Sequence, residues 1–142
     1  MYLIDKEESP KIIADHTGFY CPGLAVSPDY LQIAYILGTM KGSTLRIINK
    51  EGTLLREFPF FFFGLATSPV WSPDKRWIAF SVQPNDGVSD NDGIYIVDIT
   101  TGSTKRLTKR GHSPSWSPNG QEVVFSLDNE IYIRRAKEKR KI

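Results

Sequence analysis

The sequence predicts an all-β fold, a β-propeller of about three four-stranded blades. The prediction rests on one pattern that occurs three times: AVSPDYLQIAY, VWSPDKRWIAF and SWSPNGQEVVF. No gap is needed to align the copies, and both intervals between their serines are 45 residues: Ser27, Ser72 and Ser117. A strict period of roughly 40 to 50 residues, made of short strands and turns, is typical of radially repeated sheets in which each unit is one blade.

The second copy shows the order of strands within one blade. Alternation of apolar residues predicts strands at Ala66–Trp71, Trp77–Val82, Ile94–Asp98 and Lys105–Thr108. Between the first two strands lies Ser-Pro-Asp-Lys, in which proline presets φ and aspartate can bond nearby backbone, so a tight turn is expected there. The four strands form one antiparallel blade.

The other copies follow the same order. The strands expected in the first copy are Leu24–Val26, Gln32–Leu37, Leu45–Ile48 and Leu54–Phe58. The third copy runs through Trp116, Glu122–Leu127 and Ile131–Ile133, without a clear fourth strand. Before the first copy, Tyr2–Asp5 resembles a third strand and Lys11–Ile13 a fourth, so the chain is expected to start in mid-blade. We therefore predict one propeller domain or fragment over residues 1–142, with a partial blade at 1–14 and blades at 24–58, 65–108 and 115–142.

The repeated residues have structural roles in this interpretation. Trp71 and Trp116, with Val26 in the first copy, lie at the end of the innermost strand, where large flat side chains pack between neighbouring blades. The W-S-P-D residues are thus expected to form core and turns rather than a catalytic site.

The number of blades raises the question of closure. A chain of 142 residues holds about three repeats of 45, whereas closed propellers typically have about four to eight blades. An arc of three leaves two open flanks and unpaired strand edges. Two alternatives follow: two copies form a homodimer that closes a six-bladed ring, since closed point groups are the rule for oligomers, or the chain is a piece of a longer propeller.

Charge and hydropathy exclude some functions. Eighteen Lys and Arg against sixteen Asp and Glu leave a net charge of +2, too weak a field to steer nucleic acid, and we expect no nucleic-acid partner. The longest apolar run, Phe58–Ala66, is far below the roughly 20 residues that span a bilayer, so no membrane insertion is expected. The tail Arg134–Ile142 holds six basic residues and one acidic one, and is either solvated or in contact with an acidic partner.

The compartment follows only loosely from the sequence. The single Cys21 provides no disulfide framework and no cysteine metal cluster. The stretch that follows Met1 becomes charged after four residues and lacks the apolar core of a signal peptide. We expect a soluble chain, cytoplasmic as given, or periplasmic if a signal peptide was removed.

The repeat resembles that of a known family. The string W-S-P-[DN]-x-x-x-[IV]-[AV]-F, followed by IYIVD, a Thr-Gly turn and Lys-Arg-Leu-Thr, is similar to the propeller repeat of the TolB-like family. That family's repeat commonly reads SPDG, and here only the third copy keeps the glycine, Gly120. Tyr30 and Lys75 replace it in the first two copies, which predicts a different turn geometry with an undisturbed register.

The resemblance implies a fold more than a function. Such repeats occur in periplasmic TolB proteins and in the gating propellers of prolyl oligopeptidase-like peptidases. The separate N-terminal domain of TolB proteins has no counterpart in this sequence, so the Tol-Pal role is not assigned. No serine lies in a G-x-S-x-G elbow, the mark of the hydrolase domain that accompanies peptidase propellers.

We therefore predict a non-catalytic propeller, not an enzyme, that binds or scaffolds a protein or peptide through its rim loops. The alternative is part of the gating propeller of a prolyl oligopeptidase-like hydrolase whose catalytic domain lies outside this chain. A structural fragment without a ligand is the third class.

Binding residues are expected where loops share a rim. In a propeller, the link between blades lies at the same rim as the link between the second and third strands of a blade. This topology places one polar set at that rim: Asp15, His16, Lys109, Arg110 and His112. Phe61 and Phe62, in a run of four phenylalanines, either pack inside or form an exposed partner surface.

No metal or cofactor is expected. The loop NDGVSDNDG offers the carboxylates of Asp86, Asp90 and Asp92 to calcium, but it lacks the spacing of an EF-hand and is interpreted as a turn-rich loop, with calcium as the alternative. The chain has two histidines and one cysteine, so a zinc site needs carboxylates from distant loops.

Overall fold

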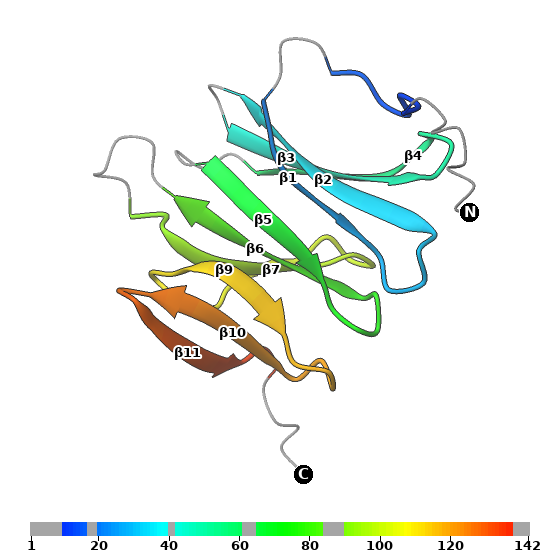
Figure 1. The fold of residues 1–142 in the computed structure, drawn as a ribbon. Helices are drawn as coiled ribbons and strands as arrows, with labels where there is room; N and C mark the ends of the chain where they lie inside the picture. Colours follow the sequence, from blue (N-terminus) through cyan, green and yellow to red (C-terminus); the bar gives the residue numbers. More distant parts are fainter. Residues whose placement is uncertain (1–9, 17–19, 40–41, 61–64, 84–89, 138–142) are drawn as a thin grey trace, which may run out of the picture.

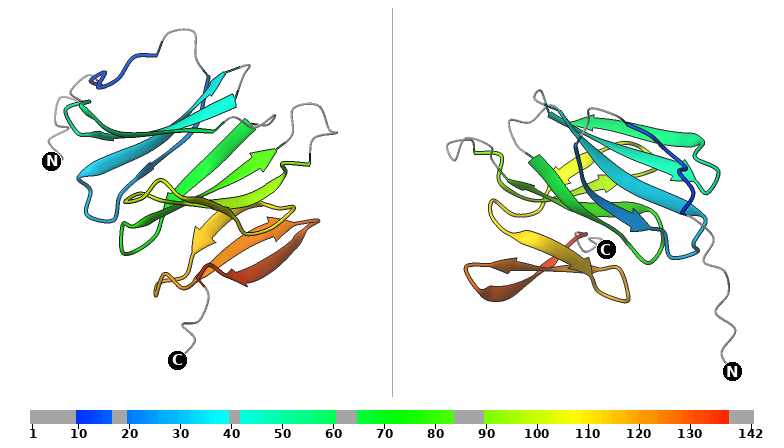
Figure 2. Two further views of the ribbon diagram at one scale, coloured as in Figure 1. Left: turned by 180° about the vertical axis from the view of Figure 1, so that it is seen from behind. Right: turned by 45° about the horizontal axis from the view of Figure 1, so that its top comes forward.

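The computed structural model describes residues 10–16, 20–39, 42–60, 65–83 and 90–137. These residues form antiparallel sheets that follow one another in chain order, with the N-terminal sheet at one end and the C-terminal sheet at the other (Figure 1). The view from behind and the view tilted by 45° show the same succession (Figure 2). None of the described segments is a helix long and apolar enough to cross a membrane. The predicted all-β class and partial propeller are confirmed.

Strand order within each sheet is that of a blade. The first sheet consists of β1 (Tyr20–Val26), β2 (Gln32–Thr39), β3 (Gly42–Asn49) and β4 (Leu54–Phe60). The second consists of β5 (Leu65–Trp71), β6 (Trp77–Gln83), β7 (Gly93–Asp98) and β8 (Thr104–Arg106). The third, within the described residues, has three strands in the order β11-β10-β9: β9 (His112–Trp116), β10 (Glu122–Leu127) and β11 (Glu130–Arg135).

The strand predictions differ from the structure in one segment and in the bounds of several strands. Residues 10–16 contain no strand, so the fourth strand expected at Lys11–Ile13 is wrong. This segment packs Ile13 onto a face of the first sheet instead of pairing with a strand edge. Strand β8 ends at Arg106 rather than Thr108 because the amides of Leu107 and Thr108 both turn to the carbonyl of Ile94, at 2.7 and 3.3 Å.

The core lies between the sheets. One cluster joins Ile36 and Ile47 of the first sheet to Phe80 and Val97 of the second. Another joins residues of the second sheet, such as Ile96, to Val123 and Phe125 of the third. Each sheet is therefore stabilised mainly by its neighbours, as expected for a repeat architecture.

A tryptophan hydrogen bond repeats at both interfaces. The Nε1 of Trp71, on the second sheet, donates to the carbonyl oxygen of Ala25 on the first at 3.1 Å. The Nε1 of Trp116, on the third sheet, donates to the carbonyl oxygen of Val70 on the second, also at 3.1 Å. The prediction that these side chains pack between blades is confirmed.

Candidate functional site

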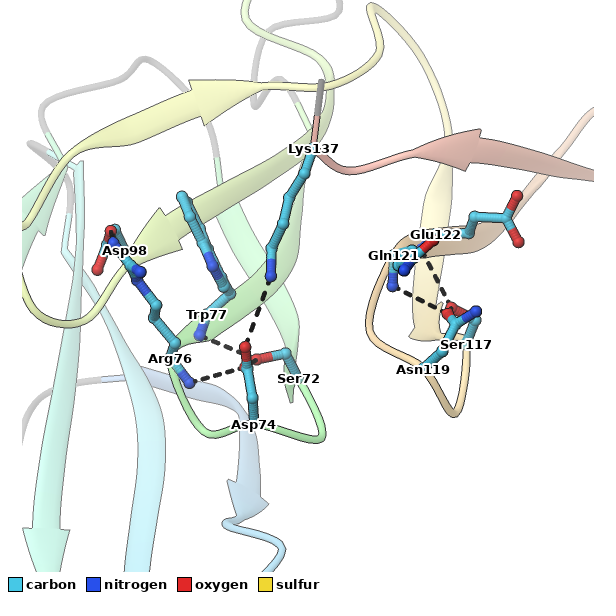
Figure 3. Close-up of polar contacts among 10 residues, drawn as sticks. All are labelled: Ser72, Asp74, Arg76, Trp77, Asp98, Ser117, Asn119, Gln121, Glu122 and Lys137. Atoms are coloured by element: carbon cyan, nitrogen blue, oxygen red, sulfur yellow. Dashed lines mark hydrogen bonds and ion pairs between the residues drawn. The ribbon is translucent and has the colours of Figure 1, made fainter. Parts of the chain in front are cut away.

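The repeated Ser-Pro-Asp turns are closed by the same hydrogen bonds in all three copies. In the second copy the Ser72 hydroxyl donates to Oδ1 of Asp74 at 2.6 Å and accepts from the amide of Trp77 at 2.9 Å (Figure 3). In the third, Ser117 donates to Oδ1 of Asn119 at 2.7 Å. The serines, and the side chains that accept from them, thus serve the turns.

The predicted change of turn geometry is wrong. The φ angles of Tyr30, Lys75 and Gly120 are 61°, 62° and 69°, so all three residues adopt the same left-handed conformation. The reason is that the same backbone hydrogen bond closes each turn: the serine carbonyl oxygen accepts from the amide of Tyr30, Lys75 or Gly120, at 2.9, 3.0 and 2.9 Å. A non-glycine residue bears the conformational cost in two of them.

Lysines join the turns of the first and second sheets to the sheet that follows each of them. Lys75 forms an ion pair with Asp29, and Nζ of Lys137 lies 3.5 Å from Oδ2 of Asp74 (Figure 3). The hydrogen bond from Lys75, followed by that from Ser27, holds the pKa of Asp29 below its ordinary value. Lys137, part of the basic tail, is thus engaged within the molecule.

Asp98 is a buried carboxylate with a structural partner. It is 3% exposed, and Nη2 of Arg76 lies 3.1 Å from its Oδ2. The amide of Thr100 donates to its other oxygen at 2.9 Å. Burial opposes the charged form, but the hydrogen bonds from Arg76 and the Thr100 amide outweigh it, so the pKa of Asp98 is lowered. This aspartate anchors a turn.

A polar hollow lies at the rim beside the third sheet. It has a volume of about 570 Å³, and its lining comes from three links between strands: Gln83, Asp92, Arg110, Gly111, His112, Leu127, Asp128 and Asn129. Within it Arg110 forms an exposed ion pair with Asp128 at 3.2 Å. Guanidinium, imidazole, amide and carboxylate groups therefore face one space, and each of them can form hydrogen bonds with a polar or charged group.

The backbone around this hollow contains left-handed residues. Asp128 and Asn129, at φ 50° and 65°, form the two-residue loop between β10 and β11, as a type I′ hairpin requires. Ser113, at φ 56°, repeats Ser68 at 54°; each precedes a proline, and each inner strand has a register shift there. Bulges of this kind re-aim side chains, and here the Ser113 hydroxyl meets Nδ1 of His112 at 3.1 Å.

The predicted polar set is divided between separate places. Asp15 and His16 line a mainly apolar hollow of about 540 Å³ on the first sheet, where Nε2 of His16 lies 2.6 Å from the Tyr35 hydroxyl. Arg110 and His112 line the rim hollow. Lys109 lines a third hollow, between the link from β8 to β9 and the strands β10 and β11. Only two of the five residues share the rim hollow.

Asp128 and Asn129 line the rim hollow but were not predicted as site residues. The sequence does indicate a hairpin at this point, because two turn-forming residues separate two strands of alternating pattern. Phe61, Phe62 and Asp86 lie outside the described residues. Among the residues described, no three His, Cys, Asp or Glu side chains gather closely enough to hold a metal ion.

Comparisons with known proteins agree with this architecture. Residues 88–142 match the model of the dipeptidyl peptidase IV N-terminal region. A probable dipeptidyl-aminopeptidase B of Metarhizium robertsii is 29% identical over 96 residues, which are 61% of this chain and 10% of that protein. The Tol-Pal system protein TolB of Alcanivorax borkumensis is 33% identical over 66 residues, 44% of this chain and 14% of that protein.

Solved structures show the same fold. The putative TolB from Agrobacterium tumefaciens has a TM-score of 0.60 at 24% identity and matches 79% of this chain and 41% of that one. The β-propeller domain of the Trilobed protease from Pyrococcus furiosus has a TM-score of 0.56 at 22% identity, over 79% and 35% of the two chains. The chain spans between 9% and 14% of the length of the curated relatives that it matches. With the repeat pattern, these matches show a partial β-propeller whose repeats are similar to those of TolB proteins and of prolyl oligopeptidase-like peptidases.

Proposed function

We propose that this chain is a non-catalytic binding or scaffolding propeller unit that contacts a protein or peptide through its rim loops. The observation that carries the proposal is the rim hollow, in which Arg110 and His112 face Asp92 and Asp128. Both signs of charge lie at the edge of one space, and the Arg110 and Asp128 side chains are 61% and 66% exposed. A peptide with charged side chains can therefore exchange this weak surface ion pair for contacts of its own.

Peptide binding tests the proposal. Fluorescein-labelled decapeptides of acidic, basic and neutral composition are titrated with the full chain, and fluorescence anisotropy is measured. Binding of at least one class is expected to weaken tenfold or more in Arg110→Ala, because hydrogen bonds to a charged group contribute about 1.5–3 kcal/mol. Lys105→Ala is the matched control, since Lys105 is an exposed cation on β8 that does not line the hollow. An equal loss in both variants, or no binding by any peptide, contradicts the proposal.

A second candidate is part of the gating propeller of a prolyl oligopeptidase-like hydrolase, with the catalytic domain elsewhere. The match of residues 88–142 to the dipeptidyl peptidase IV N-terminal region and the peptidases among the relatives favour it. A G-x-S-x-G sequence elsewhere in the gene would support this candidate. The isolated chain would then bind none of the labelled peptides.

Closure by two copies is also a proposal. A homodimer would complete a six-bladed ring by joining the flank of the third sheet to that of the first. Light scattering coupled to size exclusion tests it, because a dimer has twice the 16.1 kDa of the chain.

A further inference from the structure

The third hollow shares Arg110 with the rim hollow but differs from it in charge. It has a volume of about 390 Å³ and lies between the link from β8 to β9 and the strands β10 and β11. Among the described residues, its lining contains three cations and no carboxylate, whereas Asp92 and Asp128 line the rim hollow. The cations are Lys109 and Arg110 of the link and Arg134 of β11. We refer to this space as the cationic hollow.

Arg134 interrupts the apolar pattern of the repeat. The register of the strand pairs makes it the equivalent of Val97 in the second sheet and of Ile48 in the first. Val97 and Ile48 are 0% and 3% exposed, whereas Arg134 is exposed. The third sheet therefore presents a guanidinium group at a position where the other two sheets bury an aliphatic side chain.

The cations of the hollow are accessible to a ligand. Arg110 forms an ion pair with Asp128 at 3.2 Å, and the two side chains are 61% and 66% exposed, so water weakens their attraction. Within the described part of the chain, no carboxylate forms an ion pair with Lys109 or Arg134. Three like charges around one space give it a positive potential, which favours an anionic group.

The wall of the cationic hollow is apolar. Phe125 and Tyr132 stack with their ring centroids 5.8 Å apart, and Leu127 lies beside them. Phe125 is 6% exposed, but Tyr132 is 40% exposed, so part of the tyrosine ring remains open to a ligand. The Tyr132 hydroxyl donates to Oε2 of Glu130 at 2.6 Å, which holds the ring in place. A second aromatic ring can therefore pack on this wall while a neighbouring carboxylate meets the cations.

We propose that the cationic hollow binds an acidic side chain of a peptide that lies next to an aromatic side chain. The inference rests on the proposed function, because the peptide would run from the rim hollow into the cationic hollow past Arg110, which lines both. Arg110 would exchange Asp128 for a carboxylate of the peptide, and the aromatic ring would pack on Tyr132. Closure by two copies would use the other face of the third sheet, because side chains alternate between the faces of a strand.

Defined peptides test the inference by fluorescence anisotropy. Three labelled decapeptides with amidated C-termini share a Gly-Ser background, and their central residues are Glu-Phe-Glu, Glu-Ala-Glu or Lys-Phe-Lys. The full chain is expected to bind Glu-Phe-Glu about tenfold more tightly than Glu-Ala-Glu, because only the first places a ring on the apolar wall. Lys-Phe-Lys should bind more weakly than Glu-Phe-Glu, because like charges meet in the hollow.

Two charge reversals at neighbouring positions separate the hollow from the net charge of the chain. Arg134→Glu and Arg135→Glu change the charge equally, but Arg135 does not line the hollow, since it follows Arg134 on β11 and points to the other face. Arg134→Glu should weaken the binding of Glu-Phe-Glu at least tenfold, and Arg135→Glu by less than about threefold. Both residues are exposed, so the two melting temperatures should differ by no more than about 1 °C.

The outcomes separate this inference from the proposed function. Binding of Glu-Phe-Glu that weakens in Arg110→Ala but not in Arg134→Glu would overturn the inference and leave the proposed function standing. Equal weakening by Arg134→Glu and Arg135→Glu would also overturn it, because net charge alone would then explain the effect. Equal affinity for Glu-Phe-Glu and Glu-Ala-Glu would contradict the role of the apolar wall. Absence of binding by all three peptides would contradict both proposals.

Discussion

Replacing Trp71 by phenylalanine tests the physical account of the interface between sheets. Trp71 is 6% exposed, and its indole N–H donates to Ala25 across the first two sheets. The change removes one neutral hydrogen bond, about 1 kcal/mol, and leaves a smaller ring in a packed core, about 1–2 kcal/mol more. We expect Trp71→Phe to lower the free energy of unfolding by about 2–3 kcal/mol.

Trp77→Phe is the matched control because its indole N–H is buried without a partner. Removing this unsatisfied donor relieves a penalty of about 1–3 kcal/mol, which offsets the loss of ring volume. Urea unfolding followed by circular dichroism measures both variants, with a check that the slope is unchanged. Equal destabilisation by the two substitutions would refute the reasoning, since the hydrogen bond would then contribute nothing measurable.

Three other outcomes follow from the structure. Tyr30→Gly should raise the free energy of unfolding in urea by about 1 kcal/mol, because Tyr30 is left-handed at φ 61° and 71% exposed; a loss of stability would contradict the strain argument. The folded-state pKa of Asp98 is lowered, so its contribution to stability is present above the ordinary pKa of about 3.9 and is lost as pH falls through the folded value. The urea midpoint of the unchanged chain should therefore fall more steeply below pH 4 than that of Asp98→Asn. Parallel pH profiles of the two chains would count against this role of Asp98. Gly52→Ala places a Cβ 1.9 Å from the carbonyl oxygen of Ile13, so trypsin should cleave after Lys11 faster than in the unchanged chain; an unaltered rate would mean that the segment is held elsewhere.

The candidate site was predicted only in part. His112 and Arg110 follow from propeller topology, which places links between blades at one rim. Asp15 and His16 follow from the same rule, yet they line a hollow on the first sheet because Ile13 draws their segment onto an apolar face. Topology gives the rim on which a loop lies, whereas packing decides which space its side chains face.

The sequence by itself determined the repeat, the order of strands in each blade and the positions of Trp71 and Trp116. These features are local or periodic, so the 45-residue spacing and the alternation of apolar residues are enough to predict them. The shared geometry of the Ser-Pro-Asp turns was not evident, because Tyr30 and Lys75 stand where the family has glycine.

Only the tertiary structure decided which faces are covered and which charged groups meet. Isoleucines stand at equivalent positions of the second and third sheets. In the second sheet Ile94 and Ile96 are buried, whereas in the third Ile131 and Ile133 are exposed. They differ because, among the described residues, a neighbouring sheet covers Ile94 and Ile96 and none covers Ile131 and Ile133. Burial is a property of the neighbour, and a repeated sequence contains no local signal that tells a covered blade from an uncovered one.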